Sequence, residues 1–424
     1  MPGDTPTGSF GAVVARHQAE GRTVVQPRMG FADPARMRAG LLATKRARAR
    51  TVGTITLDSY TRVGDHAAVA EALARGHELN GYPIVGHTPD TTRRVLSGIA
   101  GPDFPVQVRH GSADPRTVLR ALLRVGLEAT EGGPVSYCLP YSRTPLARAV
   151  DHWREACEQL AAARTPDREP HLETFGGCMM GQLCPPALLV ALSVLEGTFF
   201  VQCGLGDLSL SYAQQTNAEQ DREAVVALRR LAAEFLPRAT WHIVVYGYMG
   251  LYPRTPEGAR RLLAEAARLA VATGAGRLVV KTAAEASRIP TIEENVLALE
   301  EADRAGGLCR AEPAGIADTG IHAQARALVQ AVLELSDDVG RALRTAFARG
   351  YLDVPHCLHP DNAGRTRSRL DAAGRLHWSD IGALPIRGAV DVPGPRPMTS
   401  AELLDALSYV RRTYDAHATE RLSS

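Results

Sequence analysis

The sequence is poor in lysine and has no long apolar run. Only Lys45 and Lys281 are lysines among 48 basic residues, so arginine carries nearly all of the positive charge. No stretch approaches the roughly 18 consecutive apolar residues that cross a bilayer, and the first residues do not show the basic and then apolar pattern of a signal peptide. We therefore expect a soluble, cytoplasmic protein without a membrane segment.

Paired cysteines and an excess of charge are also missing. The seven cysteines show no CxxC spacing, so the sequence indicates neither a disulfide framework nor a zinc finger. The formal net charge is +2, which gives no electrostatic surface for nucleic acid. His356, Cys357 and His359 form the one cluster of metal-ligand types in the sequence, and we interpret it as loop packing rather than as a metal site.

Short apolar runs alternate with amphipathic helical patterns along most of the chain. Runs of strand length, rich in β-branched residues, predict strands that are buried on both faces. They lie at 23–27, 52–58, 105–109, 126–130, 171–175, 199–203, 241–247 and 277–281. A helical pattern follows each run, and eight strand–helix units are typical of an α/β protein with a (β/α)8 TIM barrel.

This pattern divides the chain into three parts. We expect an N-terminal arm over residues 1–22, a (β/α)8 catalytic barrel over 23–305 and a C-terminal extension over 306–424 that packs on the barrel. The extension is rich in proline and glycine connections and contains a last helix near 401–413. A doubly wound open sheet is the alternative fold, but no GxGxxG loop follows the first predicted strand.

Candidate site residues lie at the carboxyl ends of the predicted strands, where barrel enzymes place their active sites. Arg28, Arg62 and Arg109 are three such residues, and each planar guanidinium can hold two carboxylate oxygens. Together they suit a small dicarboxylate or a phosphate. Glu131 could accept the ammonium of an amino acid, or it could instead cap a turn. Lys281 ends the eighth predicted strand, and because lysine is so rare in this chain we expect it to have a chemical role.

Aromatic side chains stand close to these positions. His110 and Tyr246 also lie at strand ends, while Tyr137 and Tyr141 follow the fourth strand in a segment that Pro140 keeps from being a regular helix. If these tyrosines are buried, their hydroxyls need hydrogen-bond partners. The sequence therefore predicts aromatic and charged groups together at one end of the barrel.

Nine motifs occur along the chain in a fixed order. They are QPRMG (26–30), LDSYTR (57–62), LNGYP (79–83), VRHG (108–111), EGGPVSYCLPY (131–141), FGGCMMGQLCPP (175–186), MGLYP (249–253), VVKTAAEASRIPT (279–291) and LDVPHCLHPDNAG (352–364). In this order they resemble the large, epsilon subunit of glutamate mutase, also called methylaspartate mutase. The resemblance covers roughly residues 23–390, and the RHG, EGGxxSYxxPY and VKTxxEAxxIPT elements together make it specific.

The resemblance implies an adenosylcobalamin-dependent isomerase that interconverts glutamate and 3-methylaspartate through radicals. It implies that Arg28, Arg62 and Arg109 hold the two substrate carboxylates, and that Glu131, Tyr137 and Tyr141 contact the amino group and a carboxylate. The further positions of the same substrate pocket are Thr56, Asn80 and Gly30. Catalytic roles are implied for Glu131, Arg109 and His110, and cofactor contacts for Lys281 and Glu285 at the ribose and for Met249 and Phe175.

The resemblance also implies partners. The DxHxxG motif, whose histidine binds cobalt in small cobalamin-binding subunits, is absent from this sequence. A separate small subunit would therefore supply that histidine, and the large subunits are expected to form a homodimer. The chain itself contributes no metal ligand in this reading.

The chain departs from the family pattern at two places near the cofactor. The family usually reads His-Gln-Trp-Met-Gly where this chain has Tyr246, Gly247, Tyr248, Met249 and Gly250, and a glycine-rich turn after the sixth strand is replaced by residues 202–220. The N-terminal arm is also shorter than usual. These differences indicate a divergent member.

Two other interpretations remain open at this point. A cofactor-free barrel lyase could use Lys281 as a Schiff-base nucleophile, since a lysine at a strand end permits that chemistry. Alternatively, the chain is a non-catalytic or substrate-divergent homologue that keeps the barrel.

Overall fold

The computed structural model describes residues 8–179, 183–309, 318–392, 394 and 398–420. Its centre is one sheet of eight strands in the order β1-β8-β7-β6-β5-β4-β3-β2, and every neighbouring pair is parallel. The strands are β1 (Val24–Gln26), β2 (Gly53–Thr56), β3 (Val106–Arg109), β4 (Ala129–Gly132), β5 (His171–Thr174), β6 (Asp207–Ala213), β7 (Thr240–Tyr246) and β8 (Arg277–Val279).

The two edge strands of this sheet approach each other, so the sheet is nearly closed into a barrel. The amide of Val25 donates to the carbonyl of Arg50 at 2.8 Å, and the amide of Thr56 donates to the carbonyl of Met29 at 2.8 Å. Gly30 permits this approach, because a Cβ there would lie 2.0 Å from the carbonyl oxygen of Thr56. The predicted TIM-barrel fold is confirmed.

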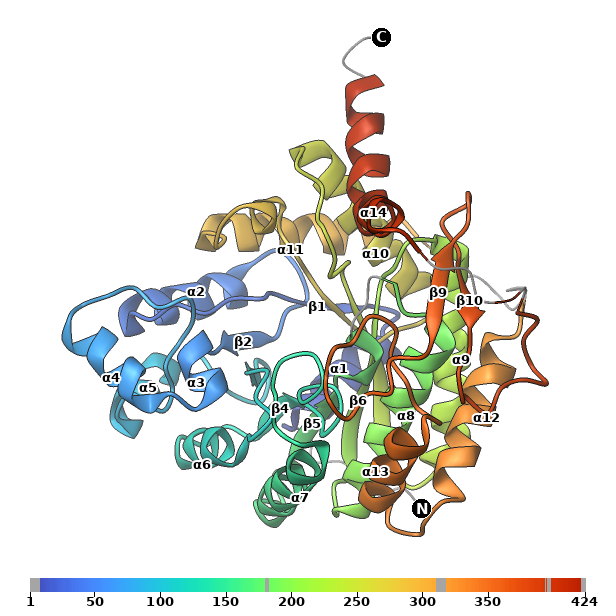
Figure 1. The fold of residues 1–424 in the computed structure, drawn as a ribbon. Helices are drawn as coiled ribbons and strands as arrows, with labels where there is room; N and C mark the ends of the chain where they lie inside the picture. The colour runs from blue at the N-terminus through green and yellow to red at the C-terminus, as the bar shows by residue number, and fades with distance from the viewer. Residues whose placement is uncertain (1–7, 180–182, 310–317, 393, 395–397, 421–424) are drawn as a thin grey trace.

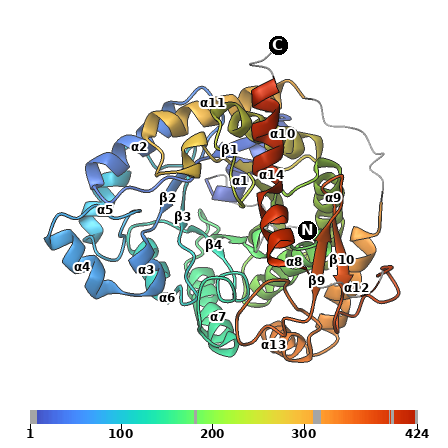
Figure 2. The same ribbon diagram turned by 45° about the horizontal axis from the view of Figure 1, so that its top comes forward.

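Helices surround the strands on the outside (Figures 1 and 2). They are α2 (Pro34–Arg46), α3 (Ser59–Val63), α4 (His66–Ala74), α5 (Pro89–Leu96), α6 (Arg116–Arg124), α7 (Leu146–Ala162), α8 (Pro186–Gln202), α9 (Ala218–Phe235), α10 (Pro256–Ala272) and α11 (Ile292–Gly307), with short 3-10 turns η1 (Gly176–Cys178) and η2 (Ala283–Ala286). None of the described helices combines the length and the apolar character that a membrane span requires.

Local sequence explains where several of these helices begin. Asp33 and Thr255 accept the backbone N–H groups of Arg36 and Gly258 with their side chains, and each is followed by a proline in the first turn. Thr291 and Glu294 form a reciprocal capping box at the start of α11. These caps satisfy N–H groups that have no partner inside the helix.

Helix α1 (Phe10–Ala19) covers the amino end of the barrel. The amide of Gly11 donates to the buried carboxylate of Asp207 at the start of β6, and the Phe10 ring stacks on His171 at the start of β5 with 4.8 Å between ring centroids. Val13 and Val14 pack in one cluster with Val24, at the start of β1. The amino end is therefore filled with side chains, and the carboxyl ends remain for a site.

The C-terminal extension packs on one side of the barrel. It comprises α12 (Ile321–Leu333), α13 (Val339–Arg349), an antiparallel hairpin of β9 (Arg367–Leu370) and β10 (Leu376–Asp380), and α14 (Ser400–Glu420). Helix α12 contacts α8 and α9, α13 contacts α7 and α8, and α14 contacts α10, as Figures 1 and 2 show. The extension thus braces the helices that follow β4, β5, β6 and β7.

One predicted strand is wrong. Residues 199–203 end α8 rather than forming the sixth strand, which is instead Asp207–Ala213. Nearly every residue of α8 is buried because α9 and α12 cover its outer side, so its sequence is apolar all round and lacks helical periodicity. The segment 202–220, interpreted above as an altered turn, accordingly contains β6 and the start of α9.

Polar side chains fill the middle of the barrel. Arg277 of β8 and Glu173 of β5 form an ion pair in which both side chains are fully buried. Arg277 also donates to Ser209 at 2.9 Å, and the Gln26 amide donates to Gln107 at 2.8 Å. A buried ion pair is costly to desolvate unless its remaining donors and acceptors find partners, and here they do. This layer supports the site above it.

Candidate active site

The centre of the site is an ion pair between residues of adjacent strands. Arg109 ends β3 and Glu131 lies near the end of β4; Arg109 Nε and Glu131 Oε2 are 2.7 Å apart, and only 5% and 3% of the two side chains are exposed. The hydroxyl of Tyr137 donates to Glu131 Oε1 at 2.5 Å, and that of Tyr246, whose single hydrogen is shared with Glu173, lies 2.7 Å from Oε2. Three of the roughly four lone-pair sites of this carboxylate are therefore occupied.

Burial fixes the protonation of the groups around Glu131. It raises the pKa of both Tyr137 and Tyr246 well above the ordinary value, so both hydroxyls keep their protons and act as donors. Burial opposes the charge of Arg109, but Glu131, Tyr246 and Tyr137 together outweigh it, and the pKa of the guanidinium rises. Glu131 thus faces one cation and two neutral donors.

The two other predicted arginines lie at the same end of the barrel. Arg62, in α3, donates through Nε to the backbone carbonyl of His110 at 3.1 Å. Gly111, which follows His110, adopts φ +77°, and a Cβ there would lie 3.1 Å from Arg62 Nε, so glycine is favoured at this position. Arg28, just after β1, pairs with Glu285 at 2.9 Å.

The charges of these arginines act on common neighbours. Arg62 and Arg109 both lower the pKa of His110. Burial raises the pKa of Tyr141, and Arg28 and Arg62 both oppose that rise. Within the described chain, Arg109 Nη1 and Arg28 Nε are buried and donate to no protein acceptor. The three arginines therefore lie around the region of His110 and Tyr141, and two of them have N–H donors that a bound ligand could accept.

His110 is a neutral imidazole in this environment. Burial, together with the charge of Arg62, lowers its pKa to about 3. Its Nδ1 accepts the amide of Ser112 at 3.0 Å, so its proton lies on Nε2. The ring stands against the rings of Tyr137 and Trp153, at 5.2 and 5.8 Å between centroids. His110 consequently contributes shape and one N–H group rather than charge.

Lys281 and Glu285 lie beyond the end of β8. Lys281 Nζ is 3.7 Å from Glu285 Oε2 and 4.8 Å from the centroid of the Tyr252 ring. Burial lowers the pKa of Lys281 to about 8, against the attraction of Glu285. Because Glu285 also binds Arg28, it links the predicted substrate residues to the predicted cofactor residues.

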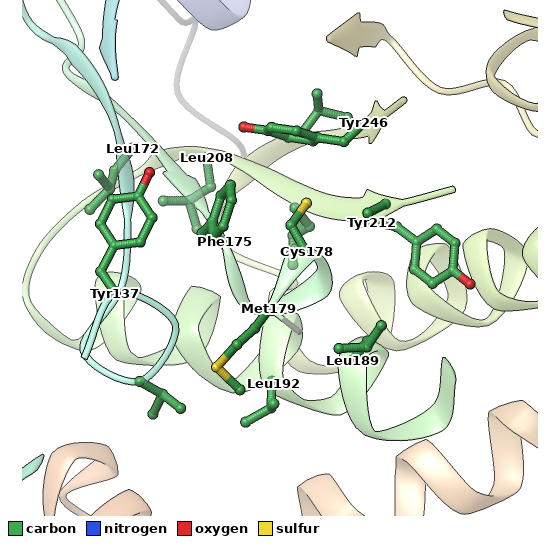
Figure 3. Close-up of a cluster of buried hydrophobic side chains, with 14 of the residues drawn as sticks. Tyr137, Leu172, Phe175, Cys178, Met179, Leu189, Leu192, Leu208, Tyr212 and Tyr246 are labelled. Carbon is green, nitrogen blue, oxygen red and sulfur yellow. The ribbon is translucent and has the colours of Figure 1, made fainter. Parts of the chain in front are cut away.

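The remaining predicted residues have different surroundings. Phe175 is buried between the rings of Tyr137 and Tyr246, at 5.0 and 5.6 Å, and Figure 3 shows the three rings together. Met249 is half-buried after β7, and Thr56 Oγ1 is a buried atom without a partner in the described chain. Asn80 is exposed and accepts the amide of Ser59, the first residue of α3.

A buried carboxylate in α8 holds the loops that carry the aromatic residues. Glu196 accepts hydrogen bonds from the amides of Val135 and Ser136 after β4 and of Phe175 and Gly176 after β5, and from the Ser136 hydroxyl. Burial raises its pKa to about 7, although these donors favour the ionised form. Glu196 thereby sets the places of Tyr137 and Phe175.

Sequence reasoning missed Glu173, Arg277 and Glu196. Their sequence signal is a charged residue inside an otherwise apolar strand or helix, as in HLETF, RLVVK and SVLEG. Such a residue must be paired if both faces of its element are buried. The pairing partners, however, come from other strands and cannot be read from the local pattern.

The predicted loop cluster at 356–359 has protein partners of its own. His359 Nδ1 accepts the amide of Asp361 at 3.1 Å, and its Nε2 lies 3.0 Å from the carbonyl of Thr144. Across the described ranges, no group of three or more His, Cys, Asp and Glu side chains is arranged to hold a metal ion. His359 instead fixes the extension against the segment after β4.

Comparison with known proteins agrees with the motifs. The family model described as Methylaspartate mutase E chain (MutE) matches residues 5–392. Glutamate mutase epsilon subunits of Halobacterium salinarum and Haloarcula marismortui are each 32% identical over 78% of this chain, and 71% and 70% of their own lengths are covered. The epsilon subunit of Desulfitobacterium hafniense is 29% identical over 89% of this chain and 81% of its own. The chain therefore belongs to the methylaspartate mutase E chain family.

Proposed function

We propose that this chain is the catalytic large subunit of an adenosylcobalamin-dependent mutase that interconverts glutamate and 3-methylaspartate. The arrangement of Arg109 and Glu131, with Arg28 and Arg62 nearby, carries the proposal. A ligand with two carboxylates and one ammonium is complementary to these groups, because its carboxylates can face guanidinium groups and its ammonium can face Glu131. A phosphate would be repelled by Glu131.

The arginines hold the two carboxylates of this substrate. Arg62 is anchored through Nε, which leaves its Nη groups for a ligand, and Arg109 has a buried Nη1 without a partner in the described chain. Charge-assisted bonds from guanidinium to carboxylate are short and directional. Glu131 receives the substrate ammonium at its remaining lone-pair site, beside the Tyr137 hydroxyl.

The residues after β8 fit the adenosyl part of the cofactor. Adenosylcobalamin, when bound, supplies a carbon-centred radical that removes a hydrogen atom from the substrate. The Glu285 carboxylate and the Lys281 ammonium, 3.7 Å apart, provide an acceptor and a donor for the two ribose hydroxyls. Met249 and Phe175 offer apolar contacts. The buried rings of Tyr137, Phe175 and Tyr246 exclude water from the substrate.

A small cobalamin-binding subunit completes the enzyme in this proposal. The sequence has no DxHxxG motif, so the cobalt-ligating histidine comes from that partner. We also propose that large subunits pair as a homodimer and that the barrel of residues 23–305 carries the catalysis.

Reconstitution tests the proposed function. The purified chain with adenosylcobalamin should show no turnover, and adding a small cobalamin-binding subunit should produce 3-methylaspartate from glutamate. A panel of amino dicarboxylates in the same assay identifies a close analogue if glutamate is not the preferred substrate. Turnover by the chain and cofactor alone would overturn the two-subunit proposal. Corrinoid binding without turnover of any amino dicarboxylate would favour a non-catalytic homologue.

A barrel lyase with Lys281 as Schiff-base nucleophile is the second candidate. The observation that favours it is the pKa of Lys281, lowered to about 8 by burial, since a neutral amine is the nucleophile. The pairing of Lys281 with Glu285 favours the mutase instead. Borohydride reduction in the presence of a carbonyl substrate distinguishes the two, because a lyase would retain a covalent adduct on the peptide that contains Lys281.

A further inference from the structure

The hydroxyl of Tyr246 lies between two buried carboxylates. Tyr246 is the last residue of β7, and its hydroxyl is within hydrogen-bond distance of Glu131 Oε2, at 2.7 Å, and of Glu173 Oε1. In Figure 3 its oxygen points toward that of Tyr137, whereas the hydroxyl of Tyr212 points the other way. Tyr246 therefore joins the substrate layer to the layer beneath it.

Glu173 is a fixed anchor for this hydroxyl. Arg277 pairs with it from β8, Ser209 donates to it at 3.0 Å, and Gln107 donates to it at 3.2 Å. Burial opposes its charge, but Arg277, the Tyr246 hydroxyl and Arg109 together outweigh burial, and the pKa of Glu173 is lowered. Glu173, on β5, therefore remains an ionised acceptor, and its position is fixed by contacts with residues of β3, β6 and β8.

The ring of Tyr246 contacts the same ion pair as its hydroxyl. The guanidinium carbon of Arg109 lies 5.1 Å from the centroid of the ring, and the Phe175 ring packs nearly perpendicular to it, with 5.6 Å between the ring centroids. A cation over an aromatic face is attracted to it, so the ring restrains Arg109 while the hydroxyl restrains Glu131. Both members of the pair are thus held by one side chain.

We propose that Tyr246 is a positioning residue that ties the Arg109–Glu131 pair to the Glu173–Arg277 pair, and that it thereby sets the preference of the site for dicarboxylates that carry an amino group. The inference rests on the proposed function, because it takes the Glu131 carboxylate as the acceptor of the substrate ammonium. Without the hydroxyl, Glu131 is held only by Arg109 and Tyr137 and loses its link to Glu173, so the carboxylate is less restrained. An acceptor that must be ordered during binding gives lower affinity for the group it accepts.

Calorimetric titration of the full chain with glutamate and with glutarate tests the proposal. Glutarate has the same two carboxylates and lacks the amino group. The wild-type chain should prefer glutamate, and Tyr246→Phe, which keeps the ring, should reduce that preference about tenfold while glutarate affinity changes little. In the reconstituted enzyme the variant should raise KM for glutamate more than it lowers kcat.

Tyr212→Phe is the matched control. Tyr212 is also a fully buried tyrosine near the end of a barrel strand, and its hydroxyl donates to the buried carboxylate of Asp221 at 2.8 Å. Removing this hydroxyl should leave the ratio of glutamate to glutarate affinity unchanged. Thermal unfolding of both variants shows how much each loss affects the fold.

The possible results separate the role of Tyr246 from the proposed function. An unchanged ratio in Tyr246→Phe, or an equal loss of both ligands, overturns the positioning role and leaves the proposed function intact. If the wild-type chain binds neither compound, the KM values of the reconstituted enzyme decide instead; if that enzyme does not turn over glutamate either, the proposed function fails, and the inference fails with it. Should the variant not fold, fluorotyrosine at position 246 in the otherwise unchanged chain gives a second measurement: its fluorine signal should move with glutamate and not with glutarate, and equal movement overturns the proposal.

Discussion

The guanidinium of Arg109 and the carboxylate of Glu131 pair at 2.7 Å across adjacent parallel strands, almost without contact with solvent. Glu131 keeps one lone-pair site beside its contacts with Arg109, Tyr137 and Tyr246, whereas Arg109 Nη1 has no acceptor among the described residues. Leaving a buried cationic donor unpaired is costly. A buried guanidinium with an unpaired donor, beside a carboxylate with one remaining acceptor site, is therefore the arrangement expected where a ligand with both a carboxylate and an ammonium is to bind.

Arg109→Lys should lower kcat/KM for glutamate in the reconstituted enzyme by roughly tenfold to a hundredfold. A hydrogen bond to a charged group contributes about 1.5–3 kcal/mol, and an ammonium cannot bond Glu131 and a ligand carboxylate with the geometry of a guanidinium fork. Steady-state kinetics measure the loss. The control is Arg326→Lys, which alters an exposed pair with Glu234 far from the site in sequence. Equal kinetics for the two variants would make Arg109 purely structural.

Glu131→Gln should lower turnover of glutamate and weaken its binding more than that of glutarate. The substitution keeps the shape of the side chain and removes the charge that attracts an ammonium. Neutralising one member of a buried pair also leaves Arg109 uncompensated, so we expect a lower melting temperature. Comparing glutamate with glutarate on the same variant separates the loss of ammonium binding from the general loss of stability. Equal weakening of both would mean that Glu131 only supports Arg109.

The sixth strand marks the limit of what the sequence predicts about the fold. Apolar runs alternating with helical patterns predicted the barrel correctly, because strands such as β7 are buried on both faces and their sequences are continuously apolar. β6 instead carries the buried polar residues Asp207, Ser209 and Ser211; Asp207 lies beside His171, and Ser209 donates to Glu173. Those residues resemble a loop in sequence, while the fully buried end of α8 resembles a strand.

For the site, the sequence identified residues through motifs at strand ends and missed the groups that position them. Arg109, Glu131 and Tyr137 are close in the chain and meet in the structure. Glu196 reaches the amide of Ser136 from 60 residues away, and Arg277 reaches Glu173 from 104 residues away. Such contacts depend on the closure of the barrel and leave no local pattern.

Gly177→Ala should lower the free energy of unfolding by about 1–3 kcal/mol or more. A Cβ at this position would lie 1.6 Å from the carbonyl oxygen of Ser211, which belongs to the backbone of β6 and cannot turn aside. The loop after β5 would have to move, and Phe175 with it. Gly388→Ala is the control, because its Cβ would have no described atom within 4 Å. Denaturant unfolding measures both variants, and equal midpoints would contradict the prediction.

Lys281 should titrate near pH 8 in the folded chain. Burial lowers its pKa from 10.5 to about 8, so between these values the unfolded chain binds a proton that the folded chain does not. The contribution of Lys281 to the free energy of unfolding therefore rises with pH across that window. Below about pH 8 the ammonium is present and can pair with Glu285, so affinity for adenosine should fall as the pH rises above 8.

The scarcity of lysine makes this titration measurable. Reductive methylation with carbon-13 labels Lys45, Lys281 and the chain terminus, and Lys45→Arg identifies the signal of Lys281. The midpoint of that signal should lie at about 8, and Glu285→Gln should move it lower, because the Glu285 charge is what raises the pKa against burial. A midpoint near 10.5 would show that solvent reaches the ammonium freely. The pairing of Lys281 with Glu285 would then be too weak to support a ribose site.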